Sequence, residues 1–291
     1  MKPLKQPKTY DEQIEILIEK HGLIIKDKNY AKTILSRVNY YRLSAYGIGL
    51  REPENKDRYT EGATLEQLYN LYQFDEQLRG LLFGIIQNVE IELRTRIAYH
   101  VASQYGADGY MHIENFVPVM NRYGELIHES LIRDFENEVV RQRGNPFVAH
   151  HLDIYGGEFP IWAAVELFSF GMLSKLYMTM KIADRKAIAK FYGTDAHYMG
   201  SWIASLVDMR NICAHYGRVY NRPFTKSPRL YSEYRQYMSN RLFPVILTLK
   251  RINNHKWDGF ASELIELIGA FPDVNLAHVG FPENWIDVIR A

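Results

Sequence analysis

The stretch Thr64-Leu-Glu-Gln-Leu-Tyr-Asn-Leu-Tyr-Gln-Phe-Asp-Glu-Gln-Leu-Arg79 opens the longest helical pattern in the sequence. Thr64 and Gln67 form a capping box, which is the signature of a helix N-terminus. Apolar residues then recur every three or four positions over about forty residues without a proline: Leu68, Leu71, Tyr72, Leu78, Leu82, Ile85, Val89, Leu93, Ile97 and Val101. We predict one long helix, bent near Gly80 or Gly84.

Shorter helical patterns lie on both sides of this stretch. Upstream, a capping box at Thr9 and Glu12 starts a helix that Gly22 ends, and a second helix starts near Asp27 and continues into the aromatic cluster 39–42. Downstream, the apolar spacing predicts helices over 126–143, from Pro160 towards Lys181, from an Asp184 cap to about Gly193, over 231–253 with a kink at Pro244, and over 260–270.

The segment 51–62 is charged and contains proline and glycine, so we predict a loop or a hairpin there. No strand-like alternation stands out elsewhere, and the predicted fold class is all-α. We divide the chain into an N-terminal helical region (1–60), a helical core (61–230) and a C-terminal helical extension (231–291). We expect Trp285, near the end of that extension, to pack against the helices.

The composition narrows the class of protein. A chain of 291 residues can bury a large core. Lys and Arg exceed Asp and Glu by only 35 − 34 = 1, which argues against unselective coating of nucleic acid. The single cysteine, Cys213, excludes an internal disulfide and fits a reducing compartment. Because no run of about 18 apolar residues occurs, we expect a cytoplasmic protein that does not enter a membrane.

The segment Asp208–Arg222 concentrates the side chains that can cleave RNA without a metal ion. The apolar spacing of Trp202, Ile203, Leu206, Val207 and Ile212 predicts a helix that ends at Gly217. RNA supplies its own nucleophile, the 2′-hydroxyl, so cleavage needs a base, an acid and positive charge on the phosphate. His215 suits the first two roles and Arg210 the third, while Asn211 shares the His215 face and can orient its ring.

The alternatives to this interpretation are structural. Similar Arg and His spacings occur at Arg94/His100, Arg122/His128 and Arg143/His150, so the spacing alone carries little weight. Arg210 and Asp208 can form a surface ion pair, and His215 can simply interact with the helix C-terminus. Cys213 is better explained as a small packing residue than as a nucleophile.

Basic residues continue beyond the predicted helix end. Between residues 210 and 241 there are seven Lys or Arg residues and one acidic residue, a local surplus of six. Such a surplus attracts phosphate groups, although some of these side chains can pair with acids such as Glu90. We expect the supporting RNA contacts from Arg218, Asn221, Arg222, Lys226 and Arg229.

A metal site is a weaker possibility. His150, His151 and Asp153 lie close together, but their spacing has no independent support as a ligand set. We therefore predict no metal ion and no cofactor.

The segment Arg210-Asn-Ile-Cys-Ala-His215, followed by Arg218 and Asn221, resembles the signature of Abi-like abortive infection proteins of the AbiD/AbiF type, within the HEPN superfamily. Further similar segments cover roughly residues 10 to 230: Asn39-Tyr-Tyr-Arg-Leu-Ser-Ala-Tyr46, Tyr72-Gln-Phe-Asp-Glu-Gln-Leu-Arg79, Val89-Glu-Ile-Glu-Leu-Arg-Thr-Arg-Ile-Ala98 and Pro160-Ile-Trp-Ala-Ala-Val-Glu-Leu-Phe-Ser-Phe-Gly171. Tyr216 departs from the family pattern, in which another polar residue or a histidine is common at this place.

The resemblance implies a HEPN-like helical bundle with an N-terminal cap and a C-terminal extension. It further implies an anti-phage, metal-independent endoribonuclease that acts as a homodimer, with Arg210 and His215 of two chains forming a composite site. Asn211 would orient these groups and Arg218 would support them. Two alternatives stay open: a module that binds a dedicated non-coding RNA or a restraining partner protein without cleavage, and a helical scaffold that only contacts proteins.

Overall fold

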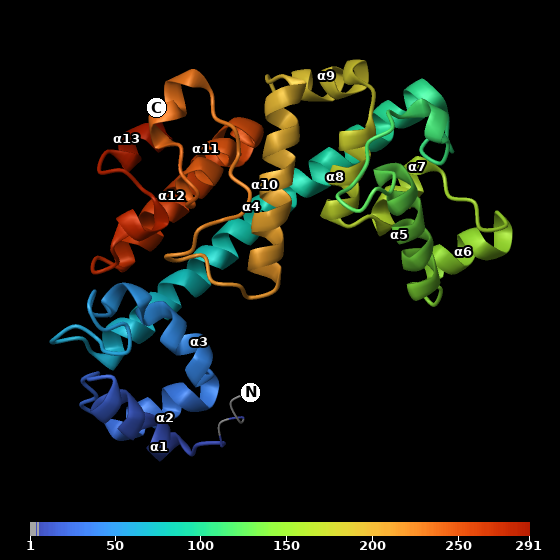
Figure 1. Ribbon diagram of the computed structural model, residues 1–291. Coiled ribbons are helices and arrows are strands. Elements are labelled where there is room, and N and C mark those ends of the chain that lie inside the picture. Colours follow the sequence, from blue (N-terminus) through green and yellow to red (C-terminus); the bar gives the residue numbers. More distant parts are fainter. Residues whose placement is uncertain (1–3, 5) are drawn as a thin grey trace.

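The computed structural model describes residue 4 and residues 6–291. In this part of the chain the regular structure consists of helices and short helical turns, and extended residues pair only in isolated bridges. The predicted all-α fold class is confirmed. Figure 1 shows one long helix, α4 (Leu65–Tyr105), which runs through the molecule with the N-terminal helices near its first residues.

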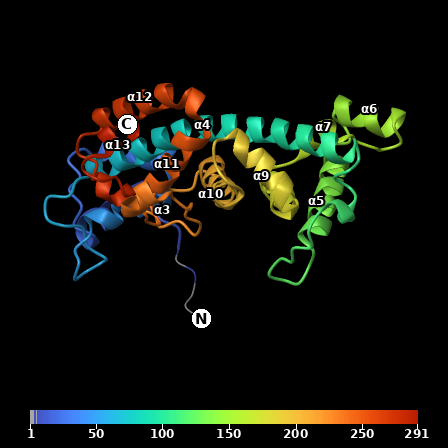
Figure 2. The same cartoon turned by 90° about the horizontal axis from the view of Figure 1, so that it is seen from above.

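Helix α4 forms where the sequence predicts it. The side chain of Thr64 accepts a hydrogen bond from the Gln67 amide at 3.2 Å, and the Gln67 side chain accepts one from the Thr64 amide at 3.1 Å. The helix has 41 residues and is therefore about 60 Å long at roughly 1.5 Å per residue. Buried side chains recur along its whole length, and Figure 2 shows other helices packed along it. It is the frame on which the rest of the chain is assembled.

The N-terminal region is built from short helical pieces: α1 (Tyr10–Glu15), the π-helical turn η1 (Ile16–Lys20), α2 (Lys28–Arg37), α3 (Tyr40–Ser44) and the 3-10 turn η2 (Ala45–Leu50). The predicted cap at Thr9 is confirmed, and the second helix begins near Asp27 as predicted, with the Asp27 side chain as its N-cap. The expectation that the second helix continues into the aromatic cluster is wrong. Val38 is extended, and the Asn39 side chain accepts a hydrogen bond from the Tyr41 amide at 2.8 Å, which starts a separate helix.

The central region is helical and contains most of the segment Arg210–His215, which we call the motif. Its elements are η3 (Ile113–Asn115), α5 (Ile127–Arg141), α6 (Pro146–Ile154), α7 (Ile161–Ala164), η4 (Val165–Leu167), α8 (Phe170–Thr179), α9 (Ile182–Phe191) and α10 (Ala196–Ala214). One helix from Pro160 towards Lys181 was expected, and this prediction is wrong. Ser169 caps α8 and separates it from α7. Asp184 does not cap α9 but lies in its first turn, where its carboxylate accepts a hydrogen bond from the Tyr105 hydroxyl at 2.7 Å.

The C-terminal region comprises η5 (Ser232–Tyr237), α11 (Phe243–Ile252), α12 (Asn254–Ala270), η6 (Leu276–Val279) and α13 (Trp285–Arg290). A single kinked helix over 231–253 was expected, but the structure has a 3-10 turn and then α11. Pro244 lies in the first turn of α11, where a missing N–H costs no helical hydrogen bond, so it starts a helix and does not kink one. Trp285 is buried, as expected.

One connected hydrophobic core links residues from Ile14 to Ile289. Helix α10 crosses α4 near the middle of the molecule (Figure 1) and packs against α8, α9 and α11 as well. The three-part division of the chain stays a prediction. No helix of the described residues has the length and apolar character needed to cross a membrane.

Candidate functional site

The motif occupies the last turn of α10 and the turn that follows it. The apolar residues that predicted this helix are all buried: Trp202, Ile203, Leu206, Val207 and Ile212. Asn211 and His215 lie on the opposite, exposed face of the same helix end. The helical period therefore presents the polar motif residues to solvent while the apolar ones hold the helix against the core.

The turn after α10 places a tyrosine in an unusual backbone conformation. The amide of Gly217 donates to the Ile212 carbonyl at 2.7 Å, and the amide of Tyr216 donates to the Cys213 carbonyl at 3.2 Å, which together form a Schellman motif. The left-handed residue is Tyr216, with φ 57°, and not the glycine that was expected to stop the helix. A left-handed conformation costs a non-glycine residue about 1–2 kcal/mol, so neighbouring contacts must hold this turn.

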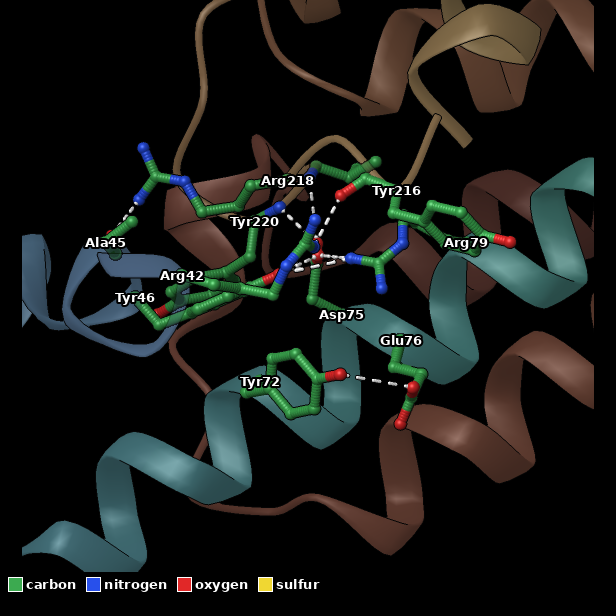
Figure 3. Close-up of polar contacts among 11 residues, drawn as sticks. Arg42, Ala45, Tyr46, Tyr72, Asp75, Glu76, Arg79, Tyr216, Arg218 and Tyr220 are labelled. Atoms are coloured by element: carbon green, nitrogen blue, oxygen red, sulfur yellow. Dashed lines mark hydrogen bonds and ion pairs between the residues drawn. The ribbon is translucent and has the colours of Figure 1, made fainter. Parts of the chain in front are cut away.

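Asp75 of α4 is the main anchor of the segment after the turn. Its carboxylate is fully buried and accepts hydrogen bonds from the amides of Val219 and Tyr220 at 2.9 and 2.6 Å. The other carboxylate oxygen accepts from the Tyr46 hydroxyl at 2.6 Å and pairs with Arg79 one turn along the helix. Figure 3 shows these groups converging on one carboxylate. Burial and the adjacent Asp75 raise the pKa of Tyr46, so its hydroxyl stays a proton donor.

Two arginines join the motif turn to the N-terminal region (Figure 3). Arg42 of α3 donates to the Tyr216 carbonyl at 2.7 Å, which supports the left-handed residue directly. Arg218 donates to the carbonyl of Ala45, and burial lowers the pKa of its guanidinium. Arg218 was expected to support RNA binding, and the structure places part of its hydrogen-bonding capacity on the protein itself.

Arg210 contacts α4 through an ion pair with Glu90. Its Nε lies 3.4 Å from the Glu90 carboxylate, which also pairs with Arg94 at 3.0 Å. The Arg210 side chain is 30% exposed, whereas that of Glu90 is 10% exposed. Glu90 therefore contacts both Arg94 of its own helix and Arg210 of α10. Glu90 thus forms an ion pair at the Nε edge of the guanidinium without a hydrogen bond to it, and part of the Arg210 side chain stays open to solvent.

The structure does not bring His215 into contact with Arg210 within one chain. The His215 side chain is exposed, and its ring makes no hydrogen bond to the described residues. The Asn211 side chain accepts a hydrogen bond from Arg210 at 3.5 Å and not from His215, whereas the Asn211 backbone carbonyl accepts from the His215 amide at 3.0 Å. Asp208 accepts from the Thr225 hydroxyl at 3.5 Å.

The other predicted contact residues are spread along the connector after the motif. Asn221 has φ 50° and accepts a hydrogen bond from Arg241 at 3.2 Å, while Arg222 is half-buried and Lys226 is exposed. Arg229 contacts the ring of His197 at the first turn of α10. His197 lies 18 residues before His215, or about 27 Å along the helix at roughly 1.5 Å per residue, so Arg229 belongs to the far end of α10.

Comparison with known proteins assigns this sequence to a family. The sequence profile of the Abi-like proteins matches residues 33–221, which is well over half of the chain. The chain belongs to the Abi-like protein family. Membership supports a role in abortive infection, a defence of bacteria against phage. Neither the curated proteins nor the solved structures give a significant match.

The Abi-like segment contains both sides of the contact network. It begins in α2, includes Arg42, Tyr46 and Asp75, and ends at Asn221, directly after the two amides that Asp75 binds. Arg42, Tyr46 and Asp75 therefore belong to one site with the turn after α10, although 144 residues separate Asp75 from Val219.

Sequence reasoning did not assign a role in the site to Asp75 and Arg79. A signal for both residues was present in the sequence. Asp75 and Arg79 are four residues apart and lie on the same helix face as the buried Leu71 and Leu78. Charged residues on a buried face must be paired or hydrogen-bonded, so their position indicates further polar contacts in the core. Within the described residues, no group of three or more His, Cys, Asp or Glu side chains is arranged to hold a metal ion.

Proposed function

We propose that this Abi-like protein is a metal-independent endoribonuclease of the HEPN type that acts in abortive infection as a homodimer. The observation that carries the proposal is the pair of solvent-open groups at the end of α10, the Arg210 guanidinium and the His215 imidazole, on a turn that buried contacts hold in place. Catalytic side chains must reach the substrate while supporting contacts keep the backbone that carries them in place.

The proposed reaction uses the substrate's own nucleophile. A base removes the proton of the RNA 2′-hydroxyl, the 2′-oxygen attacks phosphorus, and the bond from phosphorus to the 5′-oxygen breaks as an acid protonates the leaving oxygen. His215 takes one or both of these proton-transfer roles. Arg210 contacts the non-bridging phosphate oxygens and stabilises their charge in the transition state. The products carry a 2′,3′-cyclic phosphate and a 5′-hydroxyl.

The contacts around Arg210 support its role as a phosphate clamp. The Glu90 carboxylate forms an ion pair with Nε at 3.4 Å, and the Asn211 side chain accepts a long hydrogen bond of 3.5 Å from one terminal nitrogen, so two contacts favour one direction of the guanidinium before RNA binds. Preorganised charge stabilises a transition state at a smaller cost than a mobile side chain does. In this proposal Asn211 orients Arg210, a different partner from the ring that the sequence suggested.

The separation of Arg210 and His215 within one chain supports a composite site. His215 is exposed and the Arg210 side chain is 30% exposed at the same helix end, so a two-fold axis beside α10 would bring the arginine of one chain next to the histidine of the other. We propose that dimer formation completes the site. Arg218, Asn221, Arg222 and Lys226 would supply positive or polar contacts along the bound strand.

The test is cleavage of RNA by the purified protein in the presence of a metal chelator. His215→Ala is expected to lower the rate by about 10²–10⁴-fold while RNA affinity is kept. The matched control is His255→Ala, which removes another exposed histidine on α12. Cleavage that depends on divalent metal, or equal activity of the His215→Ala protein and the wild type, would refute the nuclease proposal.

One observation favours a second candidate function. Arg210 pairs with Glu90, and the His215 ring has no hydrogen-bond partner among residue 4 and residues 6–291, which also suits a surface that binds RNA without cleaving it. Such a protein would hold a dedicated non-coding RNA or a partner protein. Nucleic acid of uniform length that copurifies with the protein, together with no cleavage by the wild type, would favour this alternative.

A further inference from the structure

A second polar site lies at the end of α10 that is remote from His215. A cavity of about 390 Å³ opens there between α8, α9 and the start of α10. Its polar lining has two arginines, one histidine, three hydroxyl groups and no carboxylate: Arg185, Arg229, His197, Ser174, Ser201 and Tyr177. A cavity with this lining is suited to a negatively charged ligand.

The arginines of this cavity keep unused hydrogen-bonding capacity. Within the described part of the chain, the Nε of Arg185 is buried without a hydrogen-bond partner, as are the Nε atoms of Arg94 and Arg210. None of the ion pairs formed by the described residues includes Arg185 or Arg229. Because no carboxylate among the described residues pairs with Arg185 or Arg229, both positive charges can attract an anion into the cavity.

The protein fixes the position of Arg229 over this cavity. Its amide donates to the Ser201 hydroxyl at 2.9 Å, and its carbonyl accepts from the indole N–H of Trp202 at 2.7 Å. Its guanidinium contacts the ring of His197. Two basic side chains thus meet in the cavity wall, and the Arg229 charge would attract an anion that lies beside them.

The N-terminal amides of α10 are not the source of the attraction for an anion in this cavity. The carboxylate of Asp195 already caps α10 by accepting hydrogen bonds from the amides of His197 and Tyr198 at 2.8 and 3.1 Å. The cationic side chains of the cavity supply the attraction. Met178 and Ile182 give the same cavity an apolar wall.

We propose that this cavity binds the phosphate group of a ligand about the size of a mononucleotide. Guanidinium groups donate paired hydrogen bonds to phosphate oxygens, and the apolar wall fits the uncharged body of the ligand. The cavity volume lies at the lower end of the range for small-molecule sites, roughly 300–1,000 Å³. The site is independent of the proposed cleavage site, because neither Arg210 nor His215 lines it.

Isothermal titration calorimetry of the full chain tests this proposal with four probes. They are inorganic phosphate, adenosine monophosphate, and a short RNA with either a 5′-phosphate or a 5′-hydroxyl. Phosphate and the nucleotide are expected to bind, and Arg185→Gln is expected to weaken both by about tenfold or more, since charge-assisted hydrogen bonds are lost. Arg229→Gln, which changes an exposed side chain, should weaken them similarly.

The matched control is Lys186→Gln, which removes the same charge from the neighbouring exposed residue of α9. His215→Ala should also bind phosphate as the wild type does, so this test can fail while the nuclease proposal stands, and the reverse. Tighter binding of the nucleotide assigns the site to a free small molecule, and a preference for 5′-phosphorylated RNA assigns it to an RNA end. No binding of phosphate or nucleotide by the wild type, or equal weakening by Lys186→Gln, would overturn the proposal.

Discussion

At the scale of single residues, Asp75 holds more of the site together than any residue of the motif. Its buried carboxylate binds two backbone amides and a tyrosine hydroxyl, and it neutralises Arg79. Asp75→Asn removes this charge and leaves Arg79 buried without its partner, so we expect the free energy of unfolding to fall by about 3–5 kcal/mol. Urea denaturation measures the change. Glu76→Gln, next to Asp75 but exposed, should change stability by less than about 0.5 kcal/mol.

Cys213 gives a prediction about pH. Burial raises the pKa of its thiol to about 12, whereas an unfolded cysteine ionises near about 8.5. The folded state therefore keeps a proton that the unfolded chain loses, and the contribution of Cys213 to stability is full below about pH 8.5 and falls as pH rises towards 12. At pH 8 the native thiol should react with Ellman's reagent much more slowly than the thiol of the urea-unfolded protein. Equal reaction rates would contradict its burial.

At the scale of elements, the crossing of α4 and α10 sets the direction of Arg210. Glu90→Gln weakens the pairing of α4 with Arg210, and we expect RNA cleavage to fall by roughly ten- to a hundredfold through loss of alignment. The effect should appear in kcat, with RNA affinity little changed. Glu92→Gln removes a charge two residues along the same helix and serves as control. Similar losses in both variants would show that Glu90 has no special role.

The elements also show how far the sequence predicts this structure. The capping boxes at Thr9 and Thr64 and the buried faces of α4 and α10 were predicted correctly, because each depends on residues within a few turns. The predicted helices through Ser169 and Pro244 were wrong. In both places the apolar spacing continues across a residue that starts a new helix, so local caps decide where one helix ends and the next begins.

The site could be predicted only in its local part. Spacing alone predicted that Asn211 and His215 share one face at the end of a helix, and both residues are exposed there. The contacts that hold the turn join residues far apart in sequence, such as Arg42 and Tyr216, separated by 174 residues. Nothing in the local pattern specifies such a pairing. The left-handed conformation of Tyr216 was also missed, because Gly217, one residue later, is the residue type that ordinarily adopts it.

At the scale of the whole molecule, a composite site makes a quantitative prediction. Arg210→Ala and His215→Ala proteins should each be nearly inactive as homodimers. When the two are unfolded together and refolded as a mixture, half of the dimers are mixed, and each mixed dimer has one intact Arg210/His215 pair. The mixture should therefore recover about a quarter of wild-type cleavage. A mixture as inactive as its components would indicate that each chain works alone.

The hydrogen bonds around Asp75 also bear on what happens if the chain is cut. The loop 51–62, which is exposed over residues 53–58, lies between Tyr46 and Asp75 in sequence, yet the side chains of Tyr46 and Asp75 are hydrogen-bonded to each other. Further bonds, from Arg42 to Tyr216 and from Arg218 to Ala45, join the same two parts. A protease that nicks this loop would give two bands on a denaturing gel but a single particle under native conditions. The chain thus provides a natural place to divide the protein into two complementing fragments.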